Sequence, residues 1–164
     1  MSGSDVKAVF ITADTNAADN ASISANERPN TDFTIGGTDA SGGVATFAAG
    51  RIVTATTAGT GDSGKTVTIT GTDVNGDSQT ETITLPGSAT TTSGTKFFKT
   101  VTAASASAQP AANVSLGHAA DAADVVFAGR SRLQGLNIVC SATAGTLDFR
   151  TTSATGSSIF KVGT

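Results

Sequence analysis

Hydrophobic and polar residues alternate with a period of two along most of this chain. The clearest stretch is Lys65–Thr70, in which the β-branched residues Val67 and Ile69 are separated by threonines. A period of two places the apolar side chains on one face of an extended chain and the threonines on the other. The stretch is therefore predicted to be a half-buried β-strand.

The stretch Thr80–Leu85 repeats this pattern, and a turn containing Asn75 and Gly76 joins the two. A two-residue turn would pair Val67 with a threonine and would mix the two faces. A three-residue loop with Gly76 in the left-handed conformation instead places Val67 opposite Ile83, which keeps the apolar face continuous. We predict this second register.

Other segments show the same alternation over shorter lengths. Further strands are predicted at Val44–Phe47, Arg51–Thr56, Lys96–Ala103, Asn113–Leu116, Val125–Ala128, Arg132–Ser141, Thr146–Thr151 and Ser158–Val162. Many short strands at fairly even spacing favour an all-β fold, either a β-sandwich or a small jelly-roll-like barrel. Helical patterning is weak, and its best candidate is the short alanine-rich stretch Gly117–Ala123, which lacks an apolar stripe.

The pattern divides the chain into three parts. Residues 1–38 are mostly polar and are predicted to form an extended N-terminal arm that orders against a neighbour. Residues 39–118 carry the main β-sandwich or barrel module. Residues 119–164 carry a second small β-rich segment that is separate or part of the same domain.

Two apolar groups are candidate interface residues. The arm contains one apolar patch, Val9, Phe10 and Ile11. Phe97 and Phe98 are adjacent on a predicted strand, so their rings point to opposite sides of it. One ring is predicted to enter the core, and the other to face a second sheet or a subunit.

Composition narrows the classes of protein. More than half of the residues are Gly, Ala, Ser or Thr, Trp and Tyr are absent, and 14% are charged. Disorder requires low hydrophobicity with high charge, so the 38% hydrophobic fraction indicates a folded protein with a thin core. The net charge of −3, without clustered Lys or Arg, disfavours a nucleic-acid partner. The chain has no run of about 20 apolar residues, so no membrane partner is expected. Cys140 is the one cysteine, and it is expected to be a small buried hydrophobic residue.

Two motifs resemble enzyme sites. Gly59–Thr66 matches the phosphate-loop pattern, which requires a helix after the lysine, but Lys65 opens a predicted strand. We interpret the segment as a hairpin loop. Gly61–Gly64 resembles the nucleophile segment of chymotrypsin-like proteases, but the histidine, His118, follows Ser63, which is the wrong order. His118 is expected in a loop or an interface, and no catalytic residue or cofactor is predicted.

Asp73, Asn75 and Asp77 are two residues apart, as in the first half of a calcium-binding loop. The remaining positions of a twelve-residue calcium loop are missing. An Asn-Gly pair flanked by aspartates is also a strong hairpin signal. We interpret the segment as a turn and keep these three residues as a metal-site candidate.

Six segments of the chain resemble a known module when their order and spacing are considered together. They are Gly43–Thr46, Arg51–Thr54, Thr68–Gly76, Thr80–Gly87, Phe98–Thr102 and Asn113–Gly117. From about Gly42 to Gly117, their order and spacing resemble a module that recurs in virion structural proteins of tailed bacteriophages. Gly135–Val139 and Gly145–Arg150 are similar to short β-rich segments of such proteins.

The resemblance implies a non-enzymatic virion protein, assembled in the host cytoplasm and present in repeated copies. We expect a capsid decoration or cement protein that binds the major capsid protein, or other virion proteins, through its sheet faces and its arm. It would be a homo-oligomer, trimeric or larger, and would stabilise the shell against the pressure of packaged DNA. The alternative is a tail adaptor, tube, baseplate or fibre component. A carbohydrate-binding β-sandwich is more distant, because Trp and Tyr stacking platforms are absent.

Overall fold

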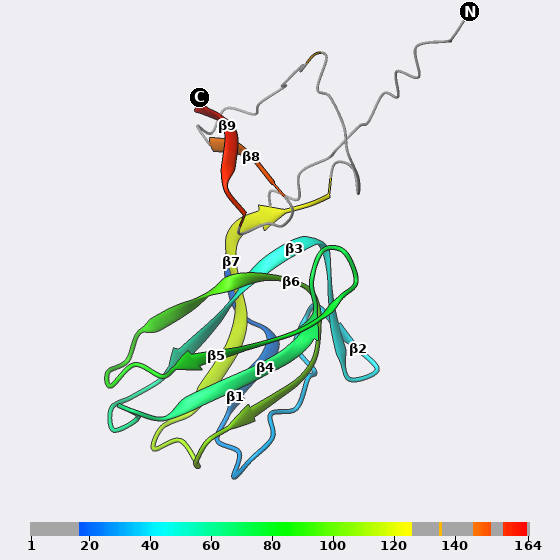
Figure 1. The fold of residues 1–164 in the computed structure, drawn as a ribbon. Helices are drawn as coiled ribbons and strands as arrows, with labels where there is room; N and C mark the ends of the chain where they lie inside the picture. The colour runs from blue at the N-terminus through cyan, green and yellow to red at the C-terminus, as the bar shows by residue number, and fades with distance from the viewer. Residues whose placement is uncertain (1–16, 126–134, 136–145, 152–155, 164) are drawn as a thin grey trace, which may run out of the picture.

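The computed structural model describes residues 17–125, 135, 146–151 and 156–163 (Figure 1). Over these ranges the fold is all-β without a helix, so the predicted fold class is confirmed. The strands are β1 (Asp19–Glu27), β2 (Ala40–Ser41), β3 (Val44–Thr57), β4 (Thr66–Thr72), β5 (Ser78–Thr84), β6 (Thr91–Ala106), β7 (Val114–Ala123), β8 (Thr146–Arg150) and β9 (Ser158–Gly163).

Strands β1 to β7 form one antiparallel sheet in the order β1-β7-β3-β6-β4-β5, with β2 paired to the start of β3. Strand β6 joins the two halves of the sheet, because it pairs with β3 on one side and with β4 on the other. The end strands β1 and β5 are not paired with each other. The sheet is therefore not closed into the barrel that was one of the two expected forms.

One hydrophobic core lies inside the bent sheet. Its larger side chains are Ile23, Phe33, Ile35, Phe47, Val53, Val67, Ile69, Ile83, Leu85, Phe98, Val101, Val114 and Leu116. Each fully buried side chain of this size stabilises the fold by about 1.5–3 kcal/mol relative to exposure. Because both halves of the sheet contribute to one cluster, they face each other across the core in a sandwich-like arrangement (Figure 1).

The predicted register of the β4–β5 hairpin is confirmed. Val67 pairs with Ile83, and Thr68 pairs with Thr82. The turn has the expected three-residue form, because Gly76 adopts a φ of 89°. A slip by one residue would have placed Val67 against a threonine and exposed part of the apolar face.

Strand β3 is longer than predicted. The two strands expected at Val44–Phe47 and Arg51–Thr56 are parts of one element. Between them, the register of pairing with β6 shifts from Thr46 to Arg51, so the strand is irregular there but is not broken. The sequence pattern is interrupted there because a bulged strand loses its strict alternation of faces.

Strand β7 is longer than the predicted strand Asn113–Leu116 and includes Gly117–Ala123, the best of the weak helical candidates. This alanine-rich stretch is not helical but continues the strand, and Ala123 pairs with Gly50 of β3. Pairing with a long neighbouring strand outweighs the helix propensity of alanine. Strand β7 also runs across the expected domain boundary at residue 118.

The expected arm over residues 1–38 is wrong for residues 19–37. Strand β1 pairs with β7, and the link between β1 and β2 buries Phe33 and Ile35 in the core. The sequence contains the signal, since Phe33 and Ile35 alternate with polar residues, but this run is short. Residues 1–16, with the candidates Val9, Phe10 and Ile11, lie outside the described residues.

Near the C-terminus, the predicted strands Thr146–Thr151 and Ser158–Val162 are confirmed as β8 and β9. They form a separate two-stranded antiparallel sheet. The strand expected at Arg132–Ser141 lies outside the described residues apart from Gly135, as does most of Val125–Ala128.

Candidate functional site

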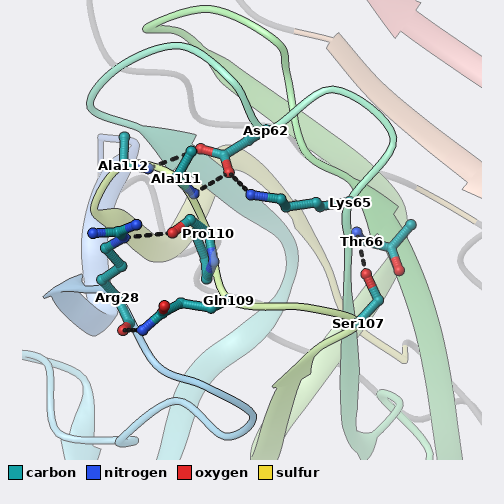
Figure 2. A network of polar contacts seen from close by, with 9 residues as sticks. All are labelled: Arg28, Asp62, Lys65, Thr66, Ser107, Gln109, Pro110, Ala111 and Ala112. Atoms are coloured by element: carbon teal, nitrogen blue, oxygen red, sulfur yellow. Dashed lines mark hydrogen bonds and ion pairs between the residues drawn. The ribbon is translucent and has the colours of Figure 1, made fainter.

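The phosphate-loop-like segment Gly59–Thr66 connects β3 to β4 (Figure 2). Lys65 leads directly into a strand, and its backbone N–H donates to the carbonyl oxygen of Asp62 at 3.0 Å. Gly61 and Gly64 adopt φ values of 93° and 81°, which side-chain-bearing residues rarely tolerate. The glycines therefore serve the turns of an interstrand loop. The prediction of a hairpin loop is wrong, because β6 lies between β3 and β4 in the sheet.

Asp62 organises this loop. Its side chain is fully buried, and its carboxylate accepts hydrogen bonds from the backbone N–H groups of Ala111 (2.5 Å) and Ala112 (3.3 Å). It also accepts one from Lys65 Nζ at 3.0 Å (Figure 2). Burial raises the pKa of Asp62, but the hydrogen bonds from Ala111, Lys65 and Ala112 together lower it below its ordinary value of 3.8.

Neighbouring polar contacts extend the network to a third segment. Arg28 Nε donates to the carbonyl oxygen of Pro110 at 2.5 Å, and the backbone N–H of Thr66 donates to Ser107 Oγ at 2.9 Å. Figure 2 shows that these groups gather where the loops before β4 and β7 meet the chain after β1. In a phosphate loop, the lysine and the amides would point at a common ligand. Here the lysine and two amides converge on Asp62, so the chain supplies its own anion.

The candidate metal residues form the predicted turn. Asp73 Oδ1 accepts hydrogen bonds from the backbone N–H groups of Asn75 (2.8 Å) and Asp77 (3.0 Å). Asn75 Nδ2 also lies 3.4 Å from Asp73 Oδ2. Across the described ranges, no group of three or more His, Cys, Asp or Glu side chains is placed to hold a metal ion. The Asp73 carboxylate acts here as the acceptor that closes the turn.

The paired phenylalanines of β6 point to opposite sides. Phe98 is fully buried in the core, which confirms the prediction that one ring is internal. Phe97 is half-buried on the other face, close to Gly50. Whether Phe97 contacts a subunit stays a prediction.

The sequence did not indicate a buried polar cluster around β7. His118 is 4% exposed, and its Nε2 lies 3.4 Å from Asp39 Oδ2, while its ring packs edge-on against Phe47. Arg51 is 1% exposed, and its Nη1 donates to the carbonyl oxygen of Ala120 at 2.8 Å. The expectation of His118 in a loop or interface is wrong, because strand pairing buries it between β3 and β1.

The outer side of β4 and β5 carries a surface that we call the threonine face. It consists of Thr66, Thr68, Thr70, Thr72, Thr80, Thr82 and Thr84. Threonines lie opposite each other across the two strands, and the hydroxyls of Thr68 and Thr82 are 3.3 Å apart. The three threonines on β5 are exposed, and the four on β4 are half-buried. The face offers methyl groups and hydroxyls to a partner without presenting a charge.

Comparison with protein families, curated proteins and solved structures found no match. Within the ranges that the structure describes, no helix has the length and apolar character to cross a bilayer. A proposal about function therefore rests on the residues, on their contacts and on the sequence resemblance.

Proposed function

We propose that this chain is a virion structural protein of a tailed bacteriophage and that it decorates the capsid. The observation that carries the proposal is the ordered set of segments that resemble the phage module. These segments lie on strands β3 to β7 or on the turns that adjoin them. The resemblance therefore follows consecutive strands of one sheet rather than scattered loops.

The use of the buried charged groups supports a structural role. Asp62 binds two backbone amides and Lys65, and Arg51 binds a carbonyl oxygen of β7. These contacts hold strands and loops together, and the residues of the two enzyme-like motifs take part in loop geometry. Such a protein would act through its surface.

The threonine face is the surface that we assign to the major capsid protein. Because it is uncharged, its contact with a partner would depend on shape, on apolar contacts of the methyl groups and on hydroxyl hydrogen bonds. Contacts of this kind are little screened by salt, unlike those between exposed charges. The virion would then hold the chain in varied ionic conditions.

The first test is cryo-electron microscopy of intact phage particles purified from a host that produces this chain. Many copies on the shell, with the threonine face turned toward the capsid surface, are expected. A ring or a few copies on the tail axis would overturn decoration in favour of a tail component. Absence from particles would overturn the virion assignment altogether.

A binding test can be made with particles from which the chain has been stripped. Thr82→Lys places an ammonium group in the assigned contact, and burying an unpaired charge there should weaken binding at least about tenfold. Ser41→Lys makes the same charge change at an exposed position on β2 and should bind like the parent chain. Equal binding of both variants would exclude the threonine face as the contact.

The arm can be tested in the same assay. A chain that lacks residues 1–16 keeps every described strand of the sheet, so its folding can be checked by its thermal unfolding. Loss of particle binding with unchanged unfolding would support the predicted contact of Val9, Phe10 and Ile11. Unchanged binding would exclude it.

A further inference from the structure

The turn between β4 and β5 presents an Asn-Gly pair to solvent. Asn75 and Gly76 are both exposed. Apart from the chain neighbours of Gly76, no heavy atom lies within 4 Å of the position that an added Cβ on this residue would take. Asn75 is also the one asparagine of the chain that precedes a glycine. Because glycine has no side chain, the backbone nitrogen after Asn75 is open to close approach.

An exposed Asn-Gly pair can react without an enzyme, and asparagine is one of the thermolabile residues of proteins. The backbone nitrogen of Gly76 attacks Cγ of Asn75, and a cyclic imide forms as the bond between Cγ and Nδ2 breaks. The proton of the attacking nitrogen leaves with the amide nitrogen as ammonia. Water then opens the imide at either of its carbonyl carbons, which gives aspartate or isoaspartate. Water is the one co-reactant, and no group is oxidised or reduced.

Hydrogen bonds of the folded turn restrain the reacting atoms. The backbone N–H of Gly76 donates to the carbonyl oxygen of Asp73 at 3.1 Å, which engages the nitrogen that must attack. Asp73 Oδ1 accepts hydrogen bonds from the backbone N–H groups of Asn75 at 2.8 Å and Asp77 at 3.0 Å. Asn75 Nδ2 lies 3.4 Å from Asp73 Oδ2. Asp73 therefore restrains the nucleophile, the backbone and the side-chain amide together.

We propose that Asn75 is a site of spontaneous deamidation and that Asp73 controls its rate. The reaction converts a neutral side chain into a carboxylate between Asp73 and Asp77. The isoaspartate product also adds one methylene group to the backbone of the loop, and loop length determines the register of a hairpin. This inference does not rest on the proposed function.

The restraint in the turn is local, so it slows the reaction without preventing it. The turn can open while the paired residues from Thr66 and Thr84 to Thr72 and Ser78 stay in register. Exposed turns open at a small cost in free energy compared with the core of a domain. The folded chain should therefore deamidate about ten- to a hundredfold more slowly than the same chain unfolded in urea.

Tryptic peptide mapping of the aged full chain tests the proposal. Trypsin cleaves after Lys65 and Lys96, and the peptide between them contains Asn75 as its one asparagine. After incubation in mildly alkaline buffer, this peptide should gain the mass difference between an amide and a carboxylic acid, and it should elute as two isomers. The exposed Asn20 and Asn113 precede Ala and Val, so they are internal controls and should react more slowly.

Variants of the turn test the role of Asp73. Asp73→Ala removes the carboxylate that accepts from Asn75 and Asp77, so it should speed deamidation at least about threefold. Asp77→Ala is the matched control, because it removes a negative charge from the same turn but leaves the hydrogen bonds to Asp73. It should deamidate at the rate of the parent chain. The comparison of folded and urea-unfolded parent chain measures the same restraint without a substitution.

The outcomes that would overturn the proposal are definite. A rate at Asn75 no higher than at Asn113 would exclude a preferred site. Equal rates in the parent chain and in Asp73→Ala, or in the folded and unfolded parent chain, would exclude control by the turn.

Hydrogen exchange on the product tests the effect of the added methylene group. Asn75→Asp is the control, because it carries the same new charge on an ordinary backbone. Amides beside the turn, at Thr72 and Ser78, should exchange faster in the isoaspartate form than in this variant. Equal exchange would exclude an effect of the longer backbone on the hairpin.

Discussion

Replacing Asp62 with asparagine tests whether one buried carboxylate holds the loops before β4 and β7 together. Asparagine keeps the size of the side chain but loses its charge and has one oxygen acceptor in place of two. The amides of Ala111 and Ala112 donate to different carboxylate oxygens, so one of them loses its acceptor in either orientation of the asparagine. If the NH₂ group takes the place of Oδ1, it also faces Lys65 Nζ as a second donor.

The magnitude follows from these contacts. A hydrogen bond to a charged group contributes about 1.5–3 kcal/mol, and a buried donor left without an acceptor costs about 1–3 kcal/mol. The Lys65 side chain is one quarter exposed, so its ion pair should add less than about 1 kcal/mol. We expect Asp62→Asn to lower the free energy of unfolding by about 3 kcal/mol, a large part of the roughly 5–15 kcal/mol typical of domains.

Urea unfolding at pH 7, followed by far-ultraviolet circular dichroism, measures the effect. Lys65→Met is the control, because it removes the ion pair but leaves both backbone hydrogen bonds to the carboxylate, and it should cost less than about 1 kcal/mol. If Asp62→Asn costs no more than this control, the assigned role of the carboxylate is wrong.

The pH dependence supplies a second check with a definite sign. Because the pKa of Asp62 is lowered in the folded chain, its contribution is fully present above the ordinary value of 3.8. It is lost as the pH falls through the lower folded value. The stability difference between the parent chain and Asp62→Asn should therefore stay constant from about pH 7 to about 5 and shrink below about 4. A difference that is unchanged at about pH 2 would refute the reasoning.

The remaining predictions concern close packing and the side-chain contacts between β5 and β6. An added Cβ at Gly117 would lie 1.9 Å from the carbonyl oxygen of Asp19, so Gly117→Ala should lower the free energy of unfolding by more than about 3 kcal/mol. At Gly36, the nearest atom would lie 3.8 Å from the added Cβ, so Gly36→Ala should lower it by less than about 1 kcal/mol. In thermal unfolding, Phe98→Ala should cost about 3–5 kcal/mol, because Phe98 is fully buried, and Phe97→Ala should cost less, because Phe97 is half-buried. The backbone N–H groups of Thr95 and Lys96 on β6 donate to the Glu81 carboxylate, so Glu81→Ala should speed hydrogen exchange at these two amides. Unchanged exchange would show that other contacts hold β5 against β6.

Several features could be predicted because their causes are local in the chain. The alternation in Lys65–Thr70 and the position of Gly76 together determine the register of the β4–β5 hairpin. The adjacency of Phe97 and Phe98 determines that the two rings point to opposite faces. The Asn-Gly pair flanked by aspartates likewise indicated a turn at residues 73–77, and the structure shows that the Asp73 carboxylate closes it.

Other features depend on which strands pair with each other. The period-two pattern locates strands along the chain but does not indicate their order in the sheet. Asp62 became the anchor of two loops because strand order brings Ala111 beside it, 49 residues along the chain. Gly117–Ala123 is a strand because β3 pairs with it, although its composition suits a helix. Strand β1 and the link after it belong to the core because β1 pairs with β7 and Phe33 of the link donates to Ala104 near the end of β6. These pairing sites exist only in the assembled sheet.

The sequence by itself therefore determined the all-β class, most strand positions and one hairpin register, because side-chain alternation and turn geometry act over a few residues. The tertiary structure decided the strand order, the open rather than barrel form and the roles of Asp62, Arg51 and His118. Those properties arise from contacts between distant segments, whose free energy depends on the whole arrangement of the sheet.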